Sequence, residues 1–475
     1  MGKTKHKTAP KARGAGFAAF MAVIMIVLAG CMARGAENES QEITKAAAEN
    51  TVRKYEEVKE EEDQKDKEDK WSGFGEINNP KVRQPTPEEA EKYPLLTNLP
   101  ALYITTEYKM SVITKETYLA ARYTLVYEDG SGIYDQPLMI KGRGNFQWAM
   151  PKKPYTVNLA KDTSLLGMKS AGKWNLLGEY IDKTLLRNYL TFWLASAAGL
   201  DNTLECRFVD AFFNGKYNGN YLITEAIQIH ENRLDINKYS EALFEIEAVY
   251  RHEDHKYCIE MIDGYIHIMY KKPGEEDLYT GLKQENLEKF KKFFNELDDS
   301  LSEGYDSYSK YIDVESFVNW YVVNEFCKNF DSNFTSSCYC YLKEGKLYMG
   351  PVWDYHTCYG SQNAATCMDP KGYHVNGSPW YGRLMQDETF FRLVTERWTR
   401  LRADGVLEDF VNDLYDTAEY ISESRILNFE LWPKSLKDSG LRGNKSRYTY
   451  EGELDYLTDW IAKRIAWLDS QWLGK

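Results

Sequence analysis

Residues 330–360 read FDSNFTSSCYCYLKEGKLYMGPVWDYHTCYG, and this stretch decides the fold of its half of the chain. The segment Lys343-Glu344-Gly345-Lys346 has the composition of a tight turn, because glycine accepts the left-handed backbone that such turns need. The residues on either side are rich in aromatic, aliphatic and cysteine side chains. The pattern therefore predicts a hairpin in which a strand over Ser336–Leu342 pairs with a strand over Leu347–Trp353.

This hairpin would bring two acidic residues toward each other. Folding the chain about the middle of the turn places Asp354 level with about residue 335, close to Asp331. Two carboxylates at one end of a hairpin can hold a divalent cation, or divide into a general base and a metal ligand. A pair of turn or capping aspartates is the alternative.

The whole chain has 475 residues and a formal net charge of −13. A nucleic-acid-binding protein would show a basic face, so we expect no nucleic-acid partner. The sequence also contains no GxSxG elbow, HExxH helix or Walker A loop. Their absence removes the commonest hydrolase, metalloprotease and P-loop hypotheses.

The first 31 residues have the pattern of a signal segment. A lysine- and arginine-rich start is followed by an apolar run over Phe17–Leu28, which is short for a membrane span. The run ends in Leu28-Ala29-Gly30-Cys31, which resembles a bacterial lipobox. We expect Cys31 to be lipidated and the rest of the chain to lie outside the cytoplasmic membrane, at the cell surface. A simple signal peptide or an uncleaved anchor is the alternative.

Residues 32–98 have the composition of a linker, and we expect one folded domain over 99–475. The stretch Glu56–Lys70 is nearly all charged, and several prolines follow it. Among the cysteines, Cys338 and Cys340 alternate on a predicted strand and are expected to fill the core. Cys358 and Cys367 bracket a loop and are candidates to form a disulfide.

Strand patterns occupy the N-terminal half of the folded region and helical patterns the C-terminal part, which is an α+β order. The predicted strands are 102–105, 123–127, 138–141, 155–159, 208–213, 221–225 and 243–247. The predicted helices are 185–198, 314–326, 390–401, 406–421 and 454–468.

Several side chains along these elements are candidates for chemistry. The loop Gly142-Arg143-Gly144-Asn145 lies between two strands and can cover phosphates with backbone N–H groups, or can simply be a structural bend. Lys153, beside this loop, can reach a phosphate as a point charge. Asp182 fits the start of a helix, and Arg187 is expected to tie elements together by ion pairing.

Three carboxylates lie on otherwise apolar strands, where each needs a basic partner or a metal. Glu225 ends one strand, and Glu245 and Glu247 lie two apart on another, so both face the same side. Any of the three can orient a nucleotide-bound cation, and spacing alone does not rank them.

The order of elements around Asp331 and Asp354 is also that of protein kinases. In a kinase an aspartate takes the proton of the substrate hydroxyl, and a later aspartate holds Mg²⁺. Kinases have an asparagine five residues after the first aspartate as a second metal ligand, and here that position is Ser336.

A series of motifs resembles the CotH family of bacterial spore-coat and surface proteins, which have an atypical protein-kinase-like fold. The resemblance covers most of residues 100–400. Its motifs, in order, are Lys141-Gly-Arg-Gly-Asn145, Trp148, Lys152-Lys-Pro-Tyr155, Leu165-Leu-Gly167, Trp174, Asp182-Lys-Thr-Leu-Leu-Arg-Asn188, Asn214-Gly-Lys-Tyr217, Gly219-x-Tyr221, Asn329-Phe-Asp331, Gly345-Lys-Leu-Tyr348, Gly350-Pro-Val-Trp-Asp354 and Gly360.

The resemblance implies a domain that binds ATP with Mg²⁺ or Mn²⁺ and phosphorylates serine or threonine of surface proteins. Asp331 would then be the catalytic acid–base residue and a metal ligand, and Asp354 the main metal ligand. Tyr348 would stack on adenine.

The sequence departs from the family pattern beside Asp354. The usual Trp-Asp-x-Asp is here Trp353-Asp354-Tyr355-His356, and neutral histidine is a poor ligand for Mg²⁺. Two further functions therefore stay open. One is a catalytically inactive surface binding or assembly module, and the other is a phosphotransferase that acts on a small molecule or glycan.

Overall fold

The computed structural model describes residues 71–74, 77–237, 241–248, 258–261, 266–271, 280–361, 364–438 and 446–474. The chain divides into two compact units, Met1–Glu76 and Ile77–Lys475, and almost all the described residues belong to the second. The predicted signal segment and Cys31 lie outside the described residues. Within the described part, no helix is both long enough and apolar enough to cross a membrane.

Seven of the described strands close into a barrel in the order β1-β2-β3-β4-β5-β7-β6. Neighbouring strands are antiparallel, except that β1 and β6 close the barrel as a parallel pair. Closure pairs both edges of the sheet, which removes the exposed strand edges of an open sheet. The strands are β1 Ala101–Thr106, β2 Leu119–Val126, β3 Gly132–Gly142, β4 Tyr155–Thr163, β5 Ala171–Leu177, β6 Cys206–Phe213 and β7 Lys216–Glu225.

The barrel interior is filled with apolar side chains from all sides. Trp174 is fully buried, and Tyr123, Ile140, Val157 and Tyr221 pack in the same cluster. Alternate residues of each strand point inward, so short runs of branched and aromatic residues are enough to build this core.

The predicted hairpin belongs to a second sheet. Among the described strands its order is β12-β11-β8-β10-β9, with β8 Ala242–Ala248, β9 Cys258–Met261, β10 Ile266–Lys271, β11 Cys338–Lys343 and β12 Lys346–Met349. β11 and β12 pair with Lys343 opposite Lys346 and Cys340 opposite Met349, which confirms the predicted register. β12 is shorter than expected, because Pro351 has no N–H to continue the ladder.

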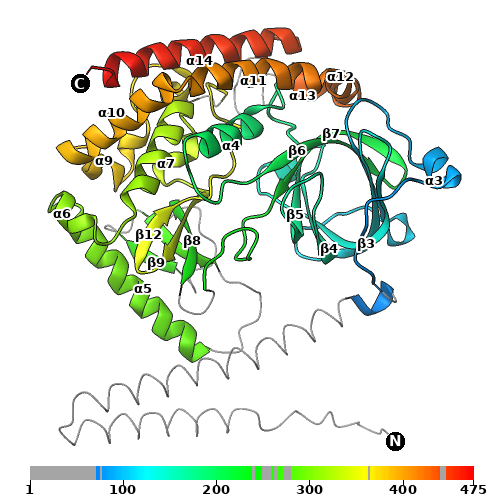
Figure 1. Cartoon of the computed structure of the whole chain (residues 1–475), viewed down its shortest axis with the longest axis horizontal. Helices are drawn as coiled ribbons and strands as arrows, with labels where there is room; N and C mark the ends of the chain where they lie inside the picture. The colour runs from blue at the N-terminus through cyan, green and yellow to red at the C-terminus, as the bar shows by residue number, and fades with distance from the viewer. Residues whose placement is uncertain are drawn as a thin grey trace, which may run out of the picture. The chain divides into compact units, whose positions relative to one another are not determined.

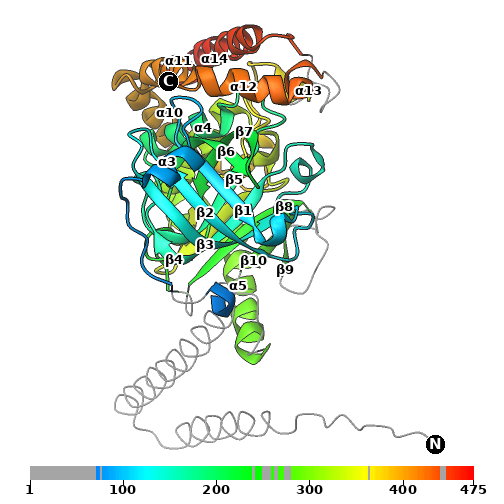
Figure 2. The same cartoon turned by 90° about the vertical axis from the view of Figure 1, so that its right-hand side faces the viewer.

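Helices make up most of the C-terminal half. Figure 1 shows α14 along the top of the molecule, with α11 and α12 just below it, whereas α5 and α6 lie lower, on the side of the second sheet. Figure 2 shows α12 above β6 and β7 of the barrel. The central helix, α7, is buried over nearly its whole length, which explains why its sequence is apolar on all sides. The helices are α3 Pro87–Lys92, α4 Arg187–Ala197, α5 Thr280–Ser300, α6 Tyr305–Tyr308, α7 Val314–Cys327, α8 Ala365–Met368, α9 Tyr381–Leu384, α10 Glu388–Ala403, α11 Val406–Tyr420, α12 Ser422–Leu431, α13 Pro433–Lys437 and α14 Tyr450–Trp472.

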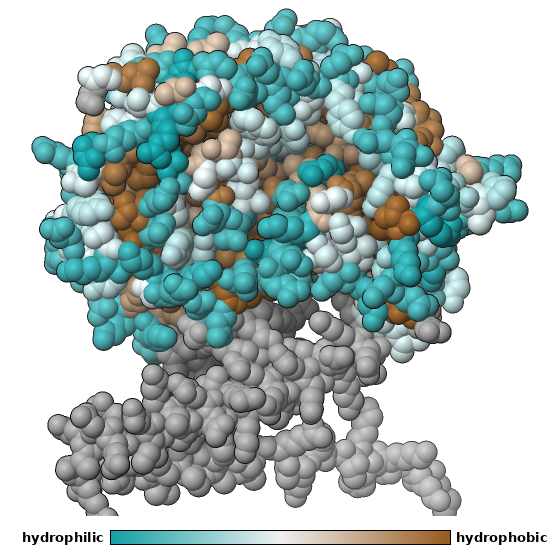
Figure 3. Space-filling view, viewed as in Figure 1, coloured by the Kyte–Doolittle hydropathy of each residue, from teal (hydrophilic) through white to brown (hydrophobic). Residues whose placement is uncertain are grey.

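The mixed α+β architecture, with antiparallel sheets and a helical C-terminal part, is confirmed. Every predicted strand and helix is present with shifted ends, and the sequence patterns missed others, among them β5, β10, α5 and α12. On the outside, hydrophilic side chains cover much of the face in Figure 3, and hydrophobic ones gather in patches between them.

The boundary of the folded unit and the cysteine pairing differ from expectation. Arg83 forms two backbone hydrogen bonds with Gly132, so the end of the predicted linker is part of the barrel unit, which begins at Ile77. The candidate disulfide is wrong, because Cys358 and Cys367 are both free and buried. The Cys358 thiol instead donates to the Tyr355 carbonyl at 2.8 Å. Cys338 and Cys340 fill the core as predicted.

Lys152 joins the barrel to the helices from a buried position. Its Nζ donates to the carbonyl of Asn220 on β7 and, at 2.7 Å, to Oδ1 of Asn428 on α12. The ammonium also lies over the Tyr221 ring, 4.6 Å from the ring centre. Burial lowers the pKa of Lys152 to about 7, although the charges of Glu179 and Asp210 oppose the shift.

This burial predicts a pH-dependent stability. Between pH 7 and 9.5 the unfolded chain keeps the Lys152 proton and the folded chain loses it, so the free energy of unfolding rises with pH. In Lys152→Met this contribution is gone. The free energy of unfolding of wild type minus that of the variant should therefore increase by about 3 kcal/mol from pH 7 to pH 9.5, as measured by urea denaturation. A difference that stays constant with pH would contradict a lowered pKa at Lys152.

Candidate active site at the base of the hairpin

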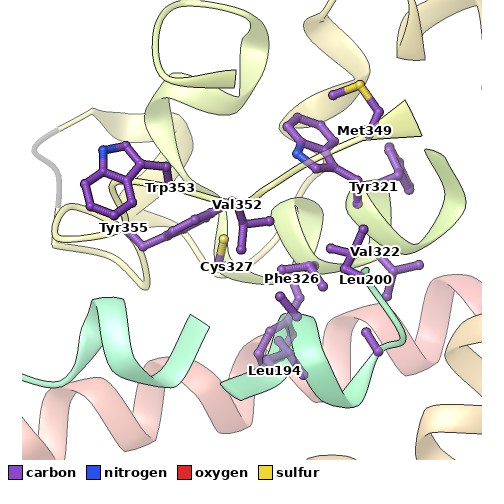
Figure 4. Packing of buried hydrophobic residues seen from close by; sticks show 14 of the residues in the cluster. Leu194, Leu200, Tyr321, Val322, Phe326, Cys327, Met349, Val352, Trp353 and Tyr355 are labelled. Carbon is purple, nitrogen blue, oxygen red and sulfur yellow. The ribbon is translucent and has the colours of Figure 1, made fainter. Parts of the chain in front are cut away.

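Asp354 lies in the segment that follows β12, between two buried aromatic anchors. Trp353 stacks on Phe192 of α4 with ring centres 6.2 Å apart. On the other side, Tyr355 donates its hydroxyl to Asn324 of α7 at 3.0 Å. Figure 4 shows Trp353 and Tyr355 grouped with Val352 in the apolar cluster that α4 and α7 share. The anchors fix the backbone on both sides of Asp354.

The Asp354 carboxylate is the accessible part of this segment. Its backbone has a φ of +67°, a left-handed conformation that aspartate tolerates better than most residues. About a third of its side chain is exposed, whereas only 6% of the His356 side chain is. Nδ1 of His356 lies 2.5 Å from Oδ1 of Asp354, so the imidazole orients the carboxylate.

A buried ion pair holds this segment from the side of α4. The Asp182 and Arg187 side chains are 0% and 1% exposed, and they form a salt bridge. The Arg187 Nε also donates to the Cys358 carbonyl at 3.0 Å, four residues after Asp354. Arg187 therefore ties elements together as the sequence predicts. Asp182 also accepts from the Arg187 backbone N–H at 2.8 Å, so it caps α4 from ahead of the formal N-cap position.

Asn188, the next residue, connects Glu179 to the same segment. Its Oδ1 accepts from the Tyr355 backbone N–H at 2.6 Å, and its Nδ2 donates to Oε1 of Glu179 at 2.9 Å. Glu179 lies between β5 and α4 and is 1% exposed. Burial raises the pKa of Glu179 to about 7, and the nearby Asp182 and Asp354 carboxylates raise it further, while Asn188 and His356 act in the opposite direction.

The glycine-containing loop contributes Arg143 to this group. The Arg143 guanidinium lies over the Trp353 ring, with 4.6 Å from Cζ to the ring centre. Burial lowers the pKa of Arg143, and the charges of Asp354, Tyr339 and Glu179 act against that shift. Gly144 has a φ of +76°, which a residue with a side chain would adopt only with strain. The bend that this glycine permits aims Arg143 at the Asp354 segment.

Asp331 lies ahead of the first strand of the same hairpin, in a 3-10 turn over Phe330–Asn333 that begins shortly after the end of α7. It is buried, at 7% exposure. Its backbone carbonyl accepts from the Thr335 N–H at 3.0 Å and from the Cys338 thiol at 3.3 Å. Burial raises the pKa of Cys338, and the Asp331 carboxylate raises it further. Asp331 is thus fixed at the start of β11, the strand that pairs with the one leading to Asp354.

The three residues predicted to bind nucleotide are each engaged with other protein groups. Lys153 donates to the Trp148 carbonyl at 2.6 Å, within the glycine-containing loop. Glu225 forms a buried ion pair with Arg233 at 2.7 Å, on the barrel. Tyr348 stacks on Tyr341 of the neighbouring strand, with ring centres 5.1 Å apart. Contact of these residues with a nucleotide stays a prediction.

Of the other two strand carboxylates, Glu245 reaches the group around Arg143. It lies opposite Tyr339 in the ladder of β8 and β11 and accepts a hydrogen bond from the Tyr339 hydroxyl. Burial raises the pKa of Tyr339 strongly, and Glu245 raises it further, while Arg143 lowers it. β8 is therefore the strand that brings a carboxylate toward this site.

Sequence patterns missed Glu179 and Asn188 as members of the site. Glu179 precedes the Asp182–Arg187 motif by only three residues, but it sits in a linking segment with no periodic pattern. The sequence placed Arg143 in a loop that either covers phosphates with backbone N–H groups or forms a structural bend, and gave its side chain no role in binding. The available signal was the motif Asp182–Asn188, which contains Asn188 and begins three residues after Glu179.

The carboxylates of this site are better suited to a cation that phosphates also bind than to a cation that only protein side chains bind. Among the described residues, no group of three His, Cys, Asp or Glu side chains is arranged to hold a metal ion. Mg²⁺ that binds with a nucleotide needs only one or two carboxylates, since phosphates and water complete its shell. Asp354 is accessible enough to be one of them. His356 Nδ1 is engaged with Asp354 and so orients this ligand.

The fold and site thus define a mixed α+β domain in which the glycine-containing loop places Arg143 beside the segment that carries Asp354. The family model described as CotH kinase protein matches residues 140–468, and the chain belongs to the CotH family. The match begins in β3 and ends in α14, so it includes every residue of the site described above. None of the curated proteins matches the chain.

The buried pair predicts a large stability difference between two arginine variants. Arg187→Met leaves Asp182 buried without its cation, which should cost about 3–5 kcal/mol in urea denaturation. The matched control is Arg392→Met, because the Arg392–Glu396 pair is more than half exposed. That variant should lose less than about 1 kcal/mol. Equal losses in the two variants would show that Arg187 is not a structural clamp.

Proposed function

We propose that this protein is an atypical protein kinase that transfers the γ-phosphoryl group of ATP to serine or threonine of surface proteins. The observation that carries the proposal is the convergence of Arg143, Asp354 and Glu179 at the base of the hairpin, in a chain that belongs to the CotH family. The kinase-like fold that family membership suggests supports the same function. Phosphoryl transfer is catalysed mainly by positioning and charge stabilisation, which such a group can provide.

Each residue has a separate task in this proposal. The Arg143 guanidinium binds phosphate oxygens, for which its planar fork of donors is suited. Asp354 and Asp331 hold a divalent cation, which supplies charge neutralisation when it is bound. Asp331 also accepts the proton of the attacking hydroxyl. His356 keeps the Asp354 carboxylate in one orientation through the hydrogen bond of its Nδ1.

The nucleotide itself would lie between the hairpin and the glycine-containing loop. Tyr348 offers the ring face that is turned away from Tyr341 for stacking on adenine. Lys153 remains a candidate for phosphate contact if its bond to the Trp148 carbonyl opens. For Glu225 we propose a structural role, because Arg233 already compensates its charge.

The location of the domain is also part of the proposal. A lipid on Cys31 would anchor the chain to the membrane, and the charged stretch that follows would hold the domain away from the surface. The substrates would then be proteins exposed at the same cell surface.

One observation favours a second candidate, a catalytically inactive surface binding module. Where the family pattern has a second aspartate, His356 stands, and its Nδ1 is already bonded to Asp354. If this bond prevents cation binding, the fold serves only to present a binding surface. Nucleotide binding therefore separates the two functions.

Binding of ATP predicts a stabilisation that depends on Asp354. Saturating Mg²⁺–ATP or Mn²⁺–ATP should raise the melting temperature of the full chain by about 2–5 °C. Asp354→Asn should abolish this shift, and Glu344→Gln, at the opposite end of the same hairpin, should keep it. Thermal melts with and without nucleotide measure both. The absence of any shift with wild type would favour the inactive module.

Catalysis should depend on Asp331 without a matching loss of nucleotide binding. Asp331→Asn removes the proton acceptor, which should lower the rate of autophosphorylation by about 10²–10⁴-fold. Mass spectrometry of the phosphorylated chain over time gives this rate. The variant should keep most of the thermal shift with Mg²⁺–ATP, since the asparagine amide oxygen can still bind the cation and Asp354 is intact. Retained phosphotransfer would remove Asp331 as the acid–base residue.

A further inference from the structure

The turn that carries Asp331 is packed against the side chain of one histidine, His374. Nε2 of His374 lies 3.4 Å from Nδ2 of Asn333, the residue two positions after Asp331. The carbonyl groups of Asn329 and Phe330, which precede Asp331, accept hydrogen bonds from the same ring. His374 therefore contacts the turn both before and after Asp331.

A neutral imidazole matches these partners. It has one donor nitrogen and one acceptor nitrogen, so it accepts from the Asn333 amide and donates to a backbone carbonyl at the same time. Burial lowers the pKa of His374, which favours the neutral ring, and Lys328 lowers it as well, whereas Glu325 and the two carbonyl groups raise it. The Cys367 thiol also faces the ring, with its Sγ 4.0 Å from Nε2.

The backbone of His374 is fixed from the side away from the turn. Its N–H donates to Oε1 of Glu325 at 2.8 Å, and the next N–H along the chain, that of Val375, donates to Oε2 at 2.8 Å. Glu325 also lies 2.6 Å from Arg464, and both of these side chains are completely buried. His374 therefore connects the buried Glu325–Arg464 ion pair to the turn of Asp331.

The hydrogen bonds within the turn are local. Oδ1 of Asn329 accepts from the Asp331 N–H at 3.4 Å, which is long for such a bond, and the Ser332 hydroxyl donates to the Asn329 carbonyl at 2.6 Å. Such bonds fix the shape of a short 3-10 turn, but they do not fix its place in the fold. The place of a reactive side chain depends on the groups that pack against its segment.

We propose that His374 is a positioning residue for Asp331, because its ring holds the turn where the carboxylate accepts the proton of the attacking hydroxyl. The catalytic part of this inference rests on the proposed function. The contact between the ring and the turn does not, so it can be measured even in a protein that transfers no phosphate. The alternative is a buried histidine that contributes to stability alone.

Two variants of His374 test its effect on the reaction. His374→Phe fills the same space without hydrogen bonds, and it should lower the maximal rate of autophosphorylation by about 10–100-fold without changing the KM for ATP. His374→Gln has one donor and one acceptor and should recover most of this loss. The rates are measured by mass spectrometry at a temperature where every variant is folded.

The control for these rates is Tyr308→Phe. It removes a buried hydrogen bond of 3.1 Å to Asp387, elsewhere in the helical half, and it should keep the wild-type maximal rate and KM. A wild-type maximal rate in His374→Phe would overturn the proposal. An equal fall in Tyr308→Phe would also overturn it, since any loss of stability would then have the same effect.

Hydrogen–deuterium exchange of the full chain tests the contact without nucleotide. The backbone amides of residues 331–335 should exchange about tenfold faster in His374→Phe, and those of α11 should exchange as in wild type. Asn333→Ala removes the same contact from the other side and should have a similar effect. The double variant should exchange little faster than either single one, because one contact is lost only once. Effects that multiply would show that the two side chains act on the turn separately and would contradict the proposal.

The two experiments separate this inference from the proposed function. If wild type transfers no phosphate but His374→Phe accelerates exchange at the turn, the kinase is rejected and His374 is confirmed as the residue that holds the turn. If wild type is active but His374→Phe changes neither rate nor exchange, the kinase stands and the role of His374 is rejected. If His374→Phe does not fold, Asn333→Ala takes its place in both experiments, with the same expected results.

Discussion

The buried ion pair between Asp182 and Arg187 is the interaction on which the candidate site depends. It binds the first turn of α4, and through Arg187 it also holds the carbonyl of Cys358. Two charges taken out of water are stable only when each has its partner and further hydrogen bonds. Asp182 meets this condition by accepting from Thr184 and from the Arg187 backbone as well. The Asp182–Arg187 pair therefore holds the loop that carries Asp354 at a point four residues after this aspartate.

A second buried ion pair orders another part of the helical half. Glu325 of α7 and Arg464 of α14 are both completely buried and lie 2.6 Å apart. The Glu325 carboxylate also accepts the backbone N–H groups of His374 and Val375, and Arg464 donates to the carbonyls of Pro370 and Gly372. One pair thus fastens a long irregular segment to two helices. In both pairs, one arginine donates hydrogen bonds to backbone carbonyls and so orders loops that have no secondary structure of their own.

Predictions from the sequence were accurate where the determining interactions are local. The turn at Glu344-Gly345 fixes its own register, so the pairing of β11 with β12 could be derived from a few residues. Asn214-Gly215 acts in the same way between β6 and β7. β5 was missed because its residues alternate poorly and its partners, β4 and β7, are not both neighbours in sequence. The boundary at Ile77 was missed for a similar reason, since the Arg83 contact with Gly132 spans many residues.

The sequence by itself determined most of the strands and helices and the register of the hairpin, and it predicted Asp331 and Asp354 at one end of that hairpin. These features follow from periodicity and turn chemistry, which act over a few residues. Only the tertiary structure decided that the charge of Asp354 acts on both Arg143 and Glu179, and that Glu225 is compensated by Arg233. Burial and charge pairing depend on which distant segments pack together, and no local pattern encodes that choice. The closed barrel and the ion pair of Arg187 bring together the loop after β3, the segment before α4 and the end of the hairpin.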